Sequence, residues 1–225
     1  MKKSSYTLFE KDLIEAQQRF PSLHIVNLEK QKILRGSFKV IDENGKFWNS
    51  YKIEIKHTNG FPYRFPIVSE IGGQIPRLED WHIYENSGNC CITIPAKEII
   101  LCRKGITVAN FIQNHVRPYF FNQAHRKHLG IYANGEYAHG VAGKWQYYFE
   151  AFGTENKELI INNFKIFLHN NEKIHKKSKC ICGSGHRFRR CHQDIYWLLK
   201  NAPKNFIKLE LEQLERSTSF KIPNV

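Results

Sequence analysis

ILRGSFKVIDENGKFWNSYKIEI, residues 33–55, is the stretch of this sequence that decides the fold. Residues 33–41 and 47–55 are rich in β-branched and aromatic side chains, which is typical of strands. Between them, Asp42-Glu43-Asn44-Gly45 has the composition of a hairpin turn. The stretch therefore predicts two antiparallel strands joined by a short loop.

Further strands flank this hairpin. Residues 23–29 and Ile67–Ile71 have strand-like composition. The second of them follows Phe61-Pro62-Tyr63-Arg64-Phe65-Pro66, in which neither proline can donate a ladder hydrogen bond, so this hexad is expected at a sheet edge or in an extended entry segment. From Gly72 to about Thr107 no periodicity persists, which predicts a long irregular region of the kind that often carries function.

Helical periodicity marks the rest of the chain. In the first predicted helix, residues 7–19, Leu8, Leu13, Ile14 and Ala16 share roughly one face. A second helix is predicted from Thr107, its cap, to residue 128, with a kink at Pro118. The remaining predicted helices are residues 141–152, 156–168, 194–200 and 204–216. Helices and an antiparallel hairpin in one chain predict the α+β class.

Composition places the chain among folded proteins. Of its 225 residues 41% are apolar and 13% aromatic, enough for one sizeable core with a small appendage or for two small domains, so intrinsic disorder is excluded. No segment approaches the roughly 20 consecutive apolar residues of a membrane helix. Charges interrupt the start, MKKSSYTLFEKDL, before a signal peptide could form. We therefore expect a soluble, cytoplasmic protein.

The charge is strongly basic and uneven. The 34 Lys and Arg residues against 21 Asp and Glu give a formal net charge of +13, which predicts attraction to something acidic. Residues 157–225 carry 14 basic and 6 acidic side chains, a net +8, whereas residues 1–156 carry 20 and 15, a net +5. This excess keeps a second class of function open, that of a non-catalytic adaptor that binds nucleic acid or an acidic protein.

The C-terminal part also contains a metal-ligand pattern. Cys180-Ile-Cys182-Gly-Ser-Gly-His-Arg-Phe-Arg-Arg-Cys191-His192 offers three thiolates and one imidazole, the donor set of a closed tetrahedral zinc site. The Gly-Ser-Gly turn lets the chain bring its two ligand pairs together. Because four protein ligands leave no open position, we expect a structural zinc. His186 is a weaker candidate ligand, and three free cysteines in a basic loop are the alternative interpretation.

This stretch closely resembles the SEC-C motif, a small zinc-binding module. Cys180, Cys182, Cys191 and His192 match its ligand positions, and the internal Gly-Ser-Gly matches as well. The segment before it, HNNEKIHKKSK, is polar and basic and is expected to be a linker. The expected domains are therefore residues 1–168, a linker at 169–179, and a zinc module with short helices at 180–225.

The irregular region contains a second group of potentially reactive residues, which includes two adjacent cysteines. Residues 81–95 read WHIYENSGNCCITIP. A thiol displayed on a loop beside a flexible glycine can reach a carbonyl carbon. Neighbouring side chains of an extended segment point to opposite sides, so Cys90 and Cys91 are not expected to face the same way. Cys102 follows an apolar run and is expected to be buried.

The order of these elements resembles the ubiquitin-conjugating-enzyme (UBC) fold over about residues 1–168. It is particularly similar to bacterial members, some of which lie beside nucleotidyltransferases of antiphage cyclic-oligonucleotide signalling (CBASS) operons. Phe61, Pro62, Phe65 and Pro66 correspond to the proline motif of the family, His82 to the histidine before the active site, and Cys91, three residues after Gly88, to the catalytic cysteine. The resemblance implies an N-terminal helix, an antiparallel meander sheet, an irregular active-site region and C-terminal helices.

The resemblance also implies a function. Cys91 is expected to carry the C-terminal carboxyl of a protein as a thioester and to pass it to a target lysine amine, while Cys90 packs inward. The implied partners are a nucleotidyltransferase or a ubiquitin-like protein with a free C-terminus, the target lysines and an activating enzyme. Two other possibilities stay open, namely a fold that has lost catalysis and only binds a ubiquitin-like domain, and a hydrolase.

The oxyanion donor is where the sequence departs from the family. Residues 82–84 are His-Ile-Tyr, whereas eukaryotic members carry His-Pro-Asn. We favour His139, whose His-Gly context looks like the bacterial branch and which could also accept the proton of the amine. The amides of Asn86 and Asn89 are alternatives, and His82 is expected mainly to hold the loop in shape.

Overall fold

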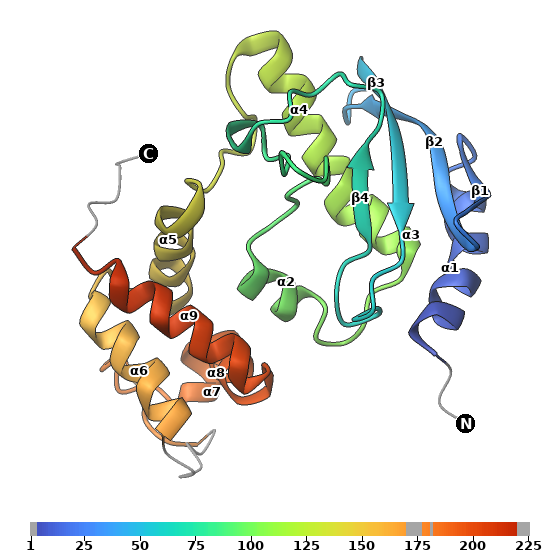
Figure 1. Cartoon of the computed structure of the whole chain (residues 1–225). Coiled ribbons are helices and arrows are strands. Elements are labelled where there is room, and N and C mark those ends of the chain that lie inside the picture. Colours follow the sequence, from blue (N-terminus) through green and yellow to red (C-terminus); the bar gives the residue numbers. More distant parts are fainter. Residues whose placement is uncertain (1–3, 170–176, 181, 220–225) are drawn as a thin grey trace. The chain divides into compact units, whose positions relative to one another are not determined.

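The computed structural model describes residues 4–169, 177–180 and 182–219. The chain is of the α+β class and divides into two compact units, coloured along the chain in Figure 1. The first unit comprises residues 1–93 and 101–136, and the second comprises residues 94–100 and 137–225. Among the described residues, no helix combines the length and apolarity needed to span a membrane.

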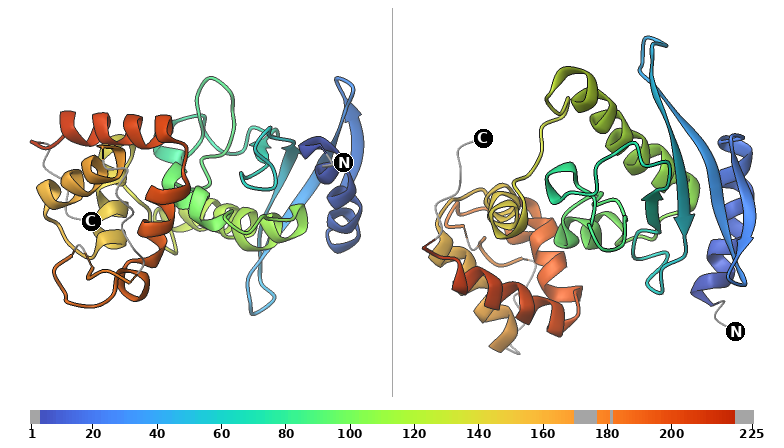
Figure 2. Two further views of the ribbon diagram at one scale, coloured as in Figure 1. Left: turned by 90° about the horizontal axis from the view of Figure 1, so that it is seen from below. Right: turned by 45° about the horizontal axis from the view of Figure 1, so that its top comes forward.

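The first unit contains a four-stranded antiparallel sheet in the order β1-β2-β3-β4 (Figure 1). Its strands are β1 (Leu23–Leu28), β2 (Gln31–Ile41), β3 (Phe47–Lys56) and β4 (Ile67–Glu70). All four were predicted from composition. The predicted hairpin is confirmed, because Asp42 Oδ1 accepts hydrogen bonds from the amides of Asn44 and Lys46 and Gly45 takes a positive φ of 80°. The tip of this β2–β3 hairpin projects from the sheet (Figure 2).

Helix α1 (Ser5–Arg19) packs on this sheet through one stripe of apolar residues. Its N-cap is Ser4, whose hydroxyl oxygen accepts a hydrogen bond from the amide of Thr7. The buried residues are Phe9, Leu13 and Ala16, whereas Ile14 is 58% exposed. The expected face was thus wrong at Ile14, because Phe9 sets the centre of the stripe and turns Ile14 toward solvent.

The long helix predicted over residues 107–128 is interrupted by a π-turn. Thr107 caps α3 (Val108–Phe111) as expected, and the chain continues through the π-helical turn η2 (Ile112–Val116) into α4 (Arg117–Leu129). The amide of Arg117 bonds to the carbonyl of Ile112, five residues back. Pro118 cannot donate a helical hydrogen bond, so the irregularity lies just before it and takes the form of a wider turn.

The core of the first unit lies between one face of the sheet and these helices. The ring of Phe120 on α4 lies 4.9 Å from that of Tyr51 on β3 and 5.8 Å from that of Phe38 on β2. Phe9 of α1 and Phe111 of α3 belong to the same buried cluster. Helix α4 is therefore anchored by aromatic packing on the sheet.

The irregular region from residue 72 to residue 107 contains two short helical elements that its sequence did not predict. They are the 3₁₀ turn η1 (Glu79–Trp81) and α2 (Pro95–Leu101). Ala96 of α2 is fully buried in the core of the second unit. Seven residues are too few for a recognisable helical period, and this explains why α2 was missed.

The second unit is helical. It contains α2 with α5 (Gly140–Phe152), α6 (Lys157–His169), α7 (Phe188–Cys191), α8 (Gln193–Asn201) and α9 (Lys204–Arg216). Its core includes the fully buried side chains of Trp145, Tyr148, Phe152, Phe164, Leu198 and Leu214. The division between compact units therefore follows residue 136, not residue 168, because α5 and α6 share one apolar core with α8 and α9.

The expected linker at 169–179 falls mainly outside the described residues.

Candidate functional site

The thiol loop, residues 82–91, pairs with the free edge of strand β4. The amide of Cys90 donates to the carbonyl of Val68 at 2.8 Å, and the amide of Cys91 donates to the carbonyl of His82 at 2.7 Å. Isolated bridges pair Asn89 with Ser69 and Cys90 with Ile83. The segment that carries both cysteines is therefore extended and held by backbone hydrogen bonds on two sides.

This extended geometry separates the two adjacent thiols. Cys90 is 8% exposed and belongs to the apolar core, whereas Cys91 is half-buried. Burial raises the pKa of the Cys90 thiol to about 12, which keeps it protonated at neutral pH. Cys102 is fully buried, as expected. Cys91 is thus the partly accessible thiol of the first unit, and the expectation that Cys90 packs inward is confirmed.

Gly88, three residues before Cys91, allows the chain to turn sharply ahead of the two cysteines. Gly88 takes a φ of 68° and its amide donates to the carbonyl of Tyr84 at 2.7 Å. A Cβ built on Gly88 would lie 3.0 Å from Cζ of Arg77, whose guanidinium covers this turn. The positive φ favours glycine at this position.

His82 lies at the other end of the thiol loop and is itself in the left-handed region, with a φ of 51°. Its Nε2 lies 2.8 Å from Oε2 of Glu136, and its ring packs 5.5 Å from that of Tyr132. Its carbonyl accepts the hydrogen bond from Cys91. The residue therefore shapes the loop through its main chain and presents an imidazole paired with a carboxylate.

Asn86, Asn89 and His139 are the other residues considered for the oxyanion. Asn89 Oδ1 accepts a hydrogen bond from Ser69 Oγ at 2.8 Å, and Asn86 is exposed. His139 belongs to the second unit, where it is the N-cap residue of α5 and is half-buried. Glu136 was missed by sequence reasoning, because no motif marks a carboxylate 54 residues away from the histidine with which it pairs.

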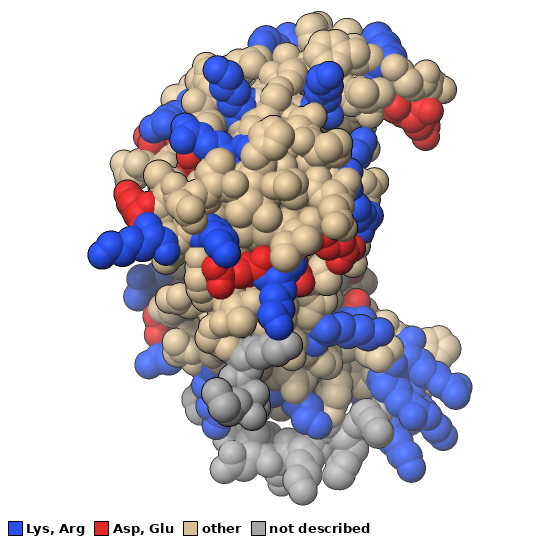
Figure 3. All heavy atoms as spheres, turned by 90° about the vertical axis from the view of Figure 1, so that its right-hand side faces the viewer, with Lys and Arg blue, Asp and Glu red and all other residues tan. Residues whose placement is uncertain are grey.

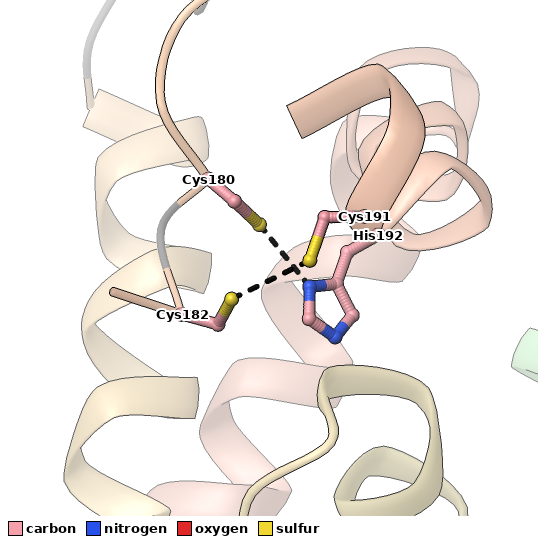
Figure 4. A group of neighbouring side chains, drawn as sticks. All are labelled: Cys180, Cys182, Cys191 and His192. Carbon is pink, nitrogen blue, oxygen red and sulfur yellow. Dashed lines mark hydrogen bonds between the residues drawn. The ribbon is translucent and has the colours of Figure 1, made fainter. Parts of the chain in front are cut away.

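The second candidate site is the cluster of three cysteines and one histidine in the second unit, shown in Figure 4. Sγ of Cys180 lies 3.1 Å from Nδ1 of His192, and Sγ of Cys182 lies 3.6 Å from Sγ of Cys191. The four ligand atoms all lie within 4.8 Å of one another, so this cluster could hold a metal ion. These are the four residues that the sequence predicted.

A tight loop brings the two ligand pairs together. The amide of Cys180 donates to the carbonyl of His186 at 2.6 Å, and the amide of Phe188 donates to the carbonyl of Ser178 at 2.9 Å. Gly183 and Gly185 take φ values of 77° and 75°, which reverse the chain between these bonds. Helix α7 then begins at the fully buried Phe188 and ends with Cys191 and the C-cap residue His192.

His192 is oriented from outside the cluster. Its ring donates a hydrogen bond to the main-chain carbonyl of Phe152, although burial dominates and lowers its pKa. Because Nδ1 faces Cys180, the donor is Nε2, which lies 3.3 Å from the position that a Cβ would take on Gly153. This bond fixes the tautomer that leaves Nδ1 free for a metal. Neither Phe152 nor Gly153 carries a sequence signal for this role.

The thiols of the cluster differ in acidity. Burial raises the pKa of Cys180 to about 12. Burial also acts to raise the pKa of Cys182, but hydrogen bonds with Ser184, Cys180 and Cys191 together outweigh it and lower this pKa to about 7. His186, the weaker candidate ligand, is exposed and does not belong to the cluster. A metal ion that binds here would displace the remaining thiol protons.

The chain was compared with protein-family models, curated proteins and solved structures, and none of them matches.

Proposed function

We propose that this protein is a UBC-like transferase that carries the C-terminal carboxyl of another protein as a thioester on Cys91. The observation that supports it best is the selection among the thiols of the first unit. Cys90 and Cys102 are buried, whereas Cys91 is half-buried on a loop with a fixed backbone. A nucleophile that exchanges acyl groups must be both reachable and held in place.

The architecture of the first unit is compatible with the proposal. A helix, a four-stranded antiparallel meander, an irregular thiol loop and a long interrupted helix follow one another in the order that the UBC fold implies. In this proposal, helices α5 and α6 correspond to the C-terminal helices of that fold and are shared with the core of the second unit.

The proposed transfer is a single acyl exchange. The ε-amine of a target lysine attacks the thioester carbonyl, the C–S bond breaks, an amide forms, and the sulfur of Cys91 leaves as a thiolate. The attacking amine loses one proton to the surrounding water. The contact of 2.8 Å between Nε2 of His82 and Oε2 of Glu136 holds the end of the thiol loop at which His82 lies. The proposed donor of the acyl group is a protein with a free C-terminus, such as a nucleotidyltransferase or a ubiquitin-like protein.

We further propose that the metal of the second unit is zinc with a structural role. Three sulfurs and one imidazole nitrogen form a donor set that zinc prefers, and Zn–S bonds of about 2.3 Å in a tetrahedron place two sulfurs about 3.8 Å apart. The sulfur atoms of Cys182 and Cys191 lie 3.6 Å apart. With all four positions taken by protein ligands, the ion would stabilise the SEC-C-like module and leave substrate chemistry to the first unit.

A trapping experiment tests the transferase. The tagged protein is isolated from its own cells under acidic, non-reducing conditions, and its intact mass is measured before and after treatment with a thiol reductant. We expect a covalent adduct that the reductant removes from the wild type but not from Cys91→Ser, in which the oxygen forms a more stable ester. Cys90→Ser is the matched control and should keep a reductant-sensitive adduct.

An adduct that persists in Cys91→Ala, or full modification of target proteins by that variant, would contradict the proposal. The identity of the adduct, read from its mass, would name the partner.

A second candidate function is a basic adaptor for nucleic acid. Basic residues lie just before the metal-ligand segment, at Lys177 and Lys179, and within it, at Arg187, Arg189 and Arg190. On the face drawn in Figure 3, Lys and Arg side chains gather at the lower right, whereas both signs of charge are interspersed over the rest. Binding to a mixed-sequence duplex that weakens steeply with salt would favour this function, and no binding near physiological salt would exclude it.

A further inference from the structure

One face of α4 is aligned with the turn that precedes the thiol loop. Tyr119, Gln123 and Arg126 are separated by four and three residues, so they lie on one side of the helix. Opposite them is η1, whose short 3₁₀ turn leaves its last carbonyls without partners inside the helix. The three side chains reach these carbonyls one by one.

The resulting hydrogen bonds form a ladder. The hydroxyl of Tyr119 donates to the carbonyl of His82 at 3.0 Å, and Nε2 of Gln123 donates to the carbonyl of Trp81 at 2.9 Å. The guanidinium of Arg126 donates to the carbonyl of Asp80. Three consecutive carbonyls, 80, 81 and 82, are thus held by three side chains of a single helix.

The ladder ends directly at the backbone of Cys91. The carbonyl of His82 accepts two hydrogen bonds, one from the hydroxyl of Tyr119 and one from the amide of Cys91. Both lone pairs of this oxygen are therefore used. The oxygen connects α4 to the nucleophile across a single atom, and the left-handed conformation of His82 is held at the same point.

The ladder is also well shielded and rigid. Tyr119 is 8% exposed and Gln123 is 1% exposed. Arg126 lies over the rings of Trp81 and Tyr132, at 4.3 Å and 4.9 Å from their centres, and pairs with the carboxylate of Asp80. Such buried and stacked donors lose little freedom when they hold their acceptors.

We propose that Tyr119, Gln123 and Arg126 are positioning residues that hold the Cys91 thiol in its reactive orientation through the carbonyls of residues 80–82. The assignment rests on the proposed use of Cys91 as an acyl carrier. The residues touch neither the acyl group nor the amine, so they act through the main chain. Loss of one donor frees the loop without removing any reacting atom.

Two substitutions test this inference in the full-length protein. Gln123→Met keeps the length and packing of the side chain but removes its donor, and Tyr119→Phe removes the hydroxyl. Gln113→Met is the matched control, because Gln113 lies on the adjacent turn η2 and is exposed. Tyr63→Phe is the control for the tyrosine, since Tyr63 is 61% exposed.

The readouts are the iodoacetamide alkylation rates of individual cysteines, resolved by tandem mass spectrometry, and the hydrogen exchange of the Cys91 amide. We expect both rates at Cys91 to rise about five-fold in Gln123→Met and Tyr119→Phe, the ratio that corresponds to one lost hydrogen bond. Alkylation of the fully buried Cys102 should stay slow, and discharge of a loaded Cys91 to free lysine should become slower even though the thiol is more accessible.

Unchanged rates at Cys91 in both variants would overturn the inference. A parallel rise at Cys102 would also overturn it, because the ladder would then serve the stability of the whole unit. If the wild type never carries a thioester but the local rise at Cys91 occurs, the positioning role is retained and the proposed transferase function fails.

Discussion

The substitution Gly153→Ala tests how the metal cluster is held by helix α5. Gly153 is the C-cap residue of α5, with a φ of 61°, and a Cβ there would lie 3.3 Å from Nε2 of His192. Two effects are expected. The left-handed conformation costs an alanine about 1 kcal/mol or more, and the new methyl group displaces the imidazole from the carbonyl of Phe152.

The second effect acts on the metal alone. Loss of an outer hydrogen bond to a ligating histidine weakens metal binding by about 10-fold to 100-fold. Because the methyl contact requires a shift of only a few tenths of an ångström, we expect the lower end, about 10-fold, which equals about 1.4 kcal/mol. Gly140→Ala is the matched control, since Gly140 begins the same helix with a φ of 62° and its Cβ would meet nothing within 4 Å.

The assay is equilibrium competition for Zn²⁺ between the protein and a chromophoric chelator. Gly153→Ala should bind about 10-fold more weakly than Gly140→Ala, while the two variants lose similar thermal stability from backbone strain. Zinc affinities of the two variants that agree within a factor of two would refute the outer hydrogen bond as a determinant of the cluster.

Three further outcomes are expected. Cys180→Ser should lower the melting temperature of the zinc-loaded protein, measured by calorimetry, to that of the chelator-treated wild type. Chelator should then not change the melting temperature of the variant any further. A remaining response to chelator would show that the metal binds elsewhere. Glu210→Ala should destabilise the second unit by about 3–5 kcal/mol in urea unfolding. The substitution leaves the buried hydroxyl of Tyr148 and the ammonium of Lys144 without their shared acceptor. A loss of less than about 1 kcal/mol would contradict this. Thr107→Ala should cost about 1 kcal/mol through the lost cap of α3, whereas Thr107→Ser should cost less.

The features that sequence predicted best are governed by local rules. β-branched and aromatic residues located the strands, Asp42 to Gly45 located the hairpin, and Thr107 marked a helix start. The metal cluster belongs to the same class. Its four ligands lie within thirteen residues, so spacing alone brings them together once glycines reverse the chain.

The features that sequence did not predict depend on distant partners. Glu136 meets His82 across 54 residues, and the carbonyl of Phe152 meets His192 across 40. The division after residue 136 arises because α5 and α6 bury their apolar faces against α8 and α9. The hydrophobic periodicity of a single helix shows which face is buried but not which helices it packs against. The π-turn before Pro118 is similar, since a proline predicts an interruption but not its form.

The most direct test of acyl transfer by Cys91 is discharge of the loaded protein to free lysine. The reductant-sensitive species is isolated from cells, mixed with lysine, and followed by intact mass. We expect the adduct to leave Cys91 as a lysine amide while the thiol is regenerated. Arginine lacks a nucleophilic primary amine at its side chain and should not be acylated there. An adduct that stays on the protein, or one that maps to a residue other than Cys91, would contradict it.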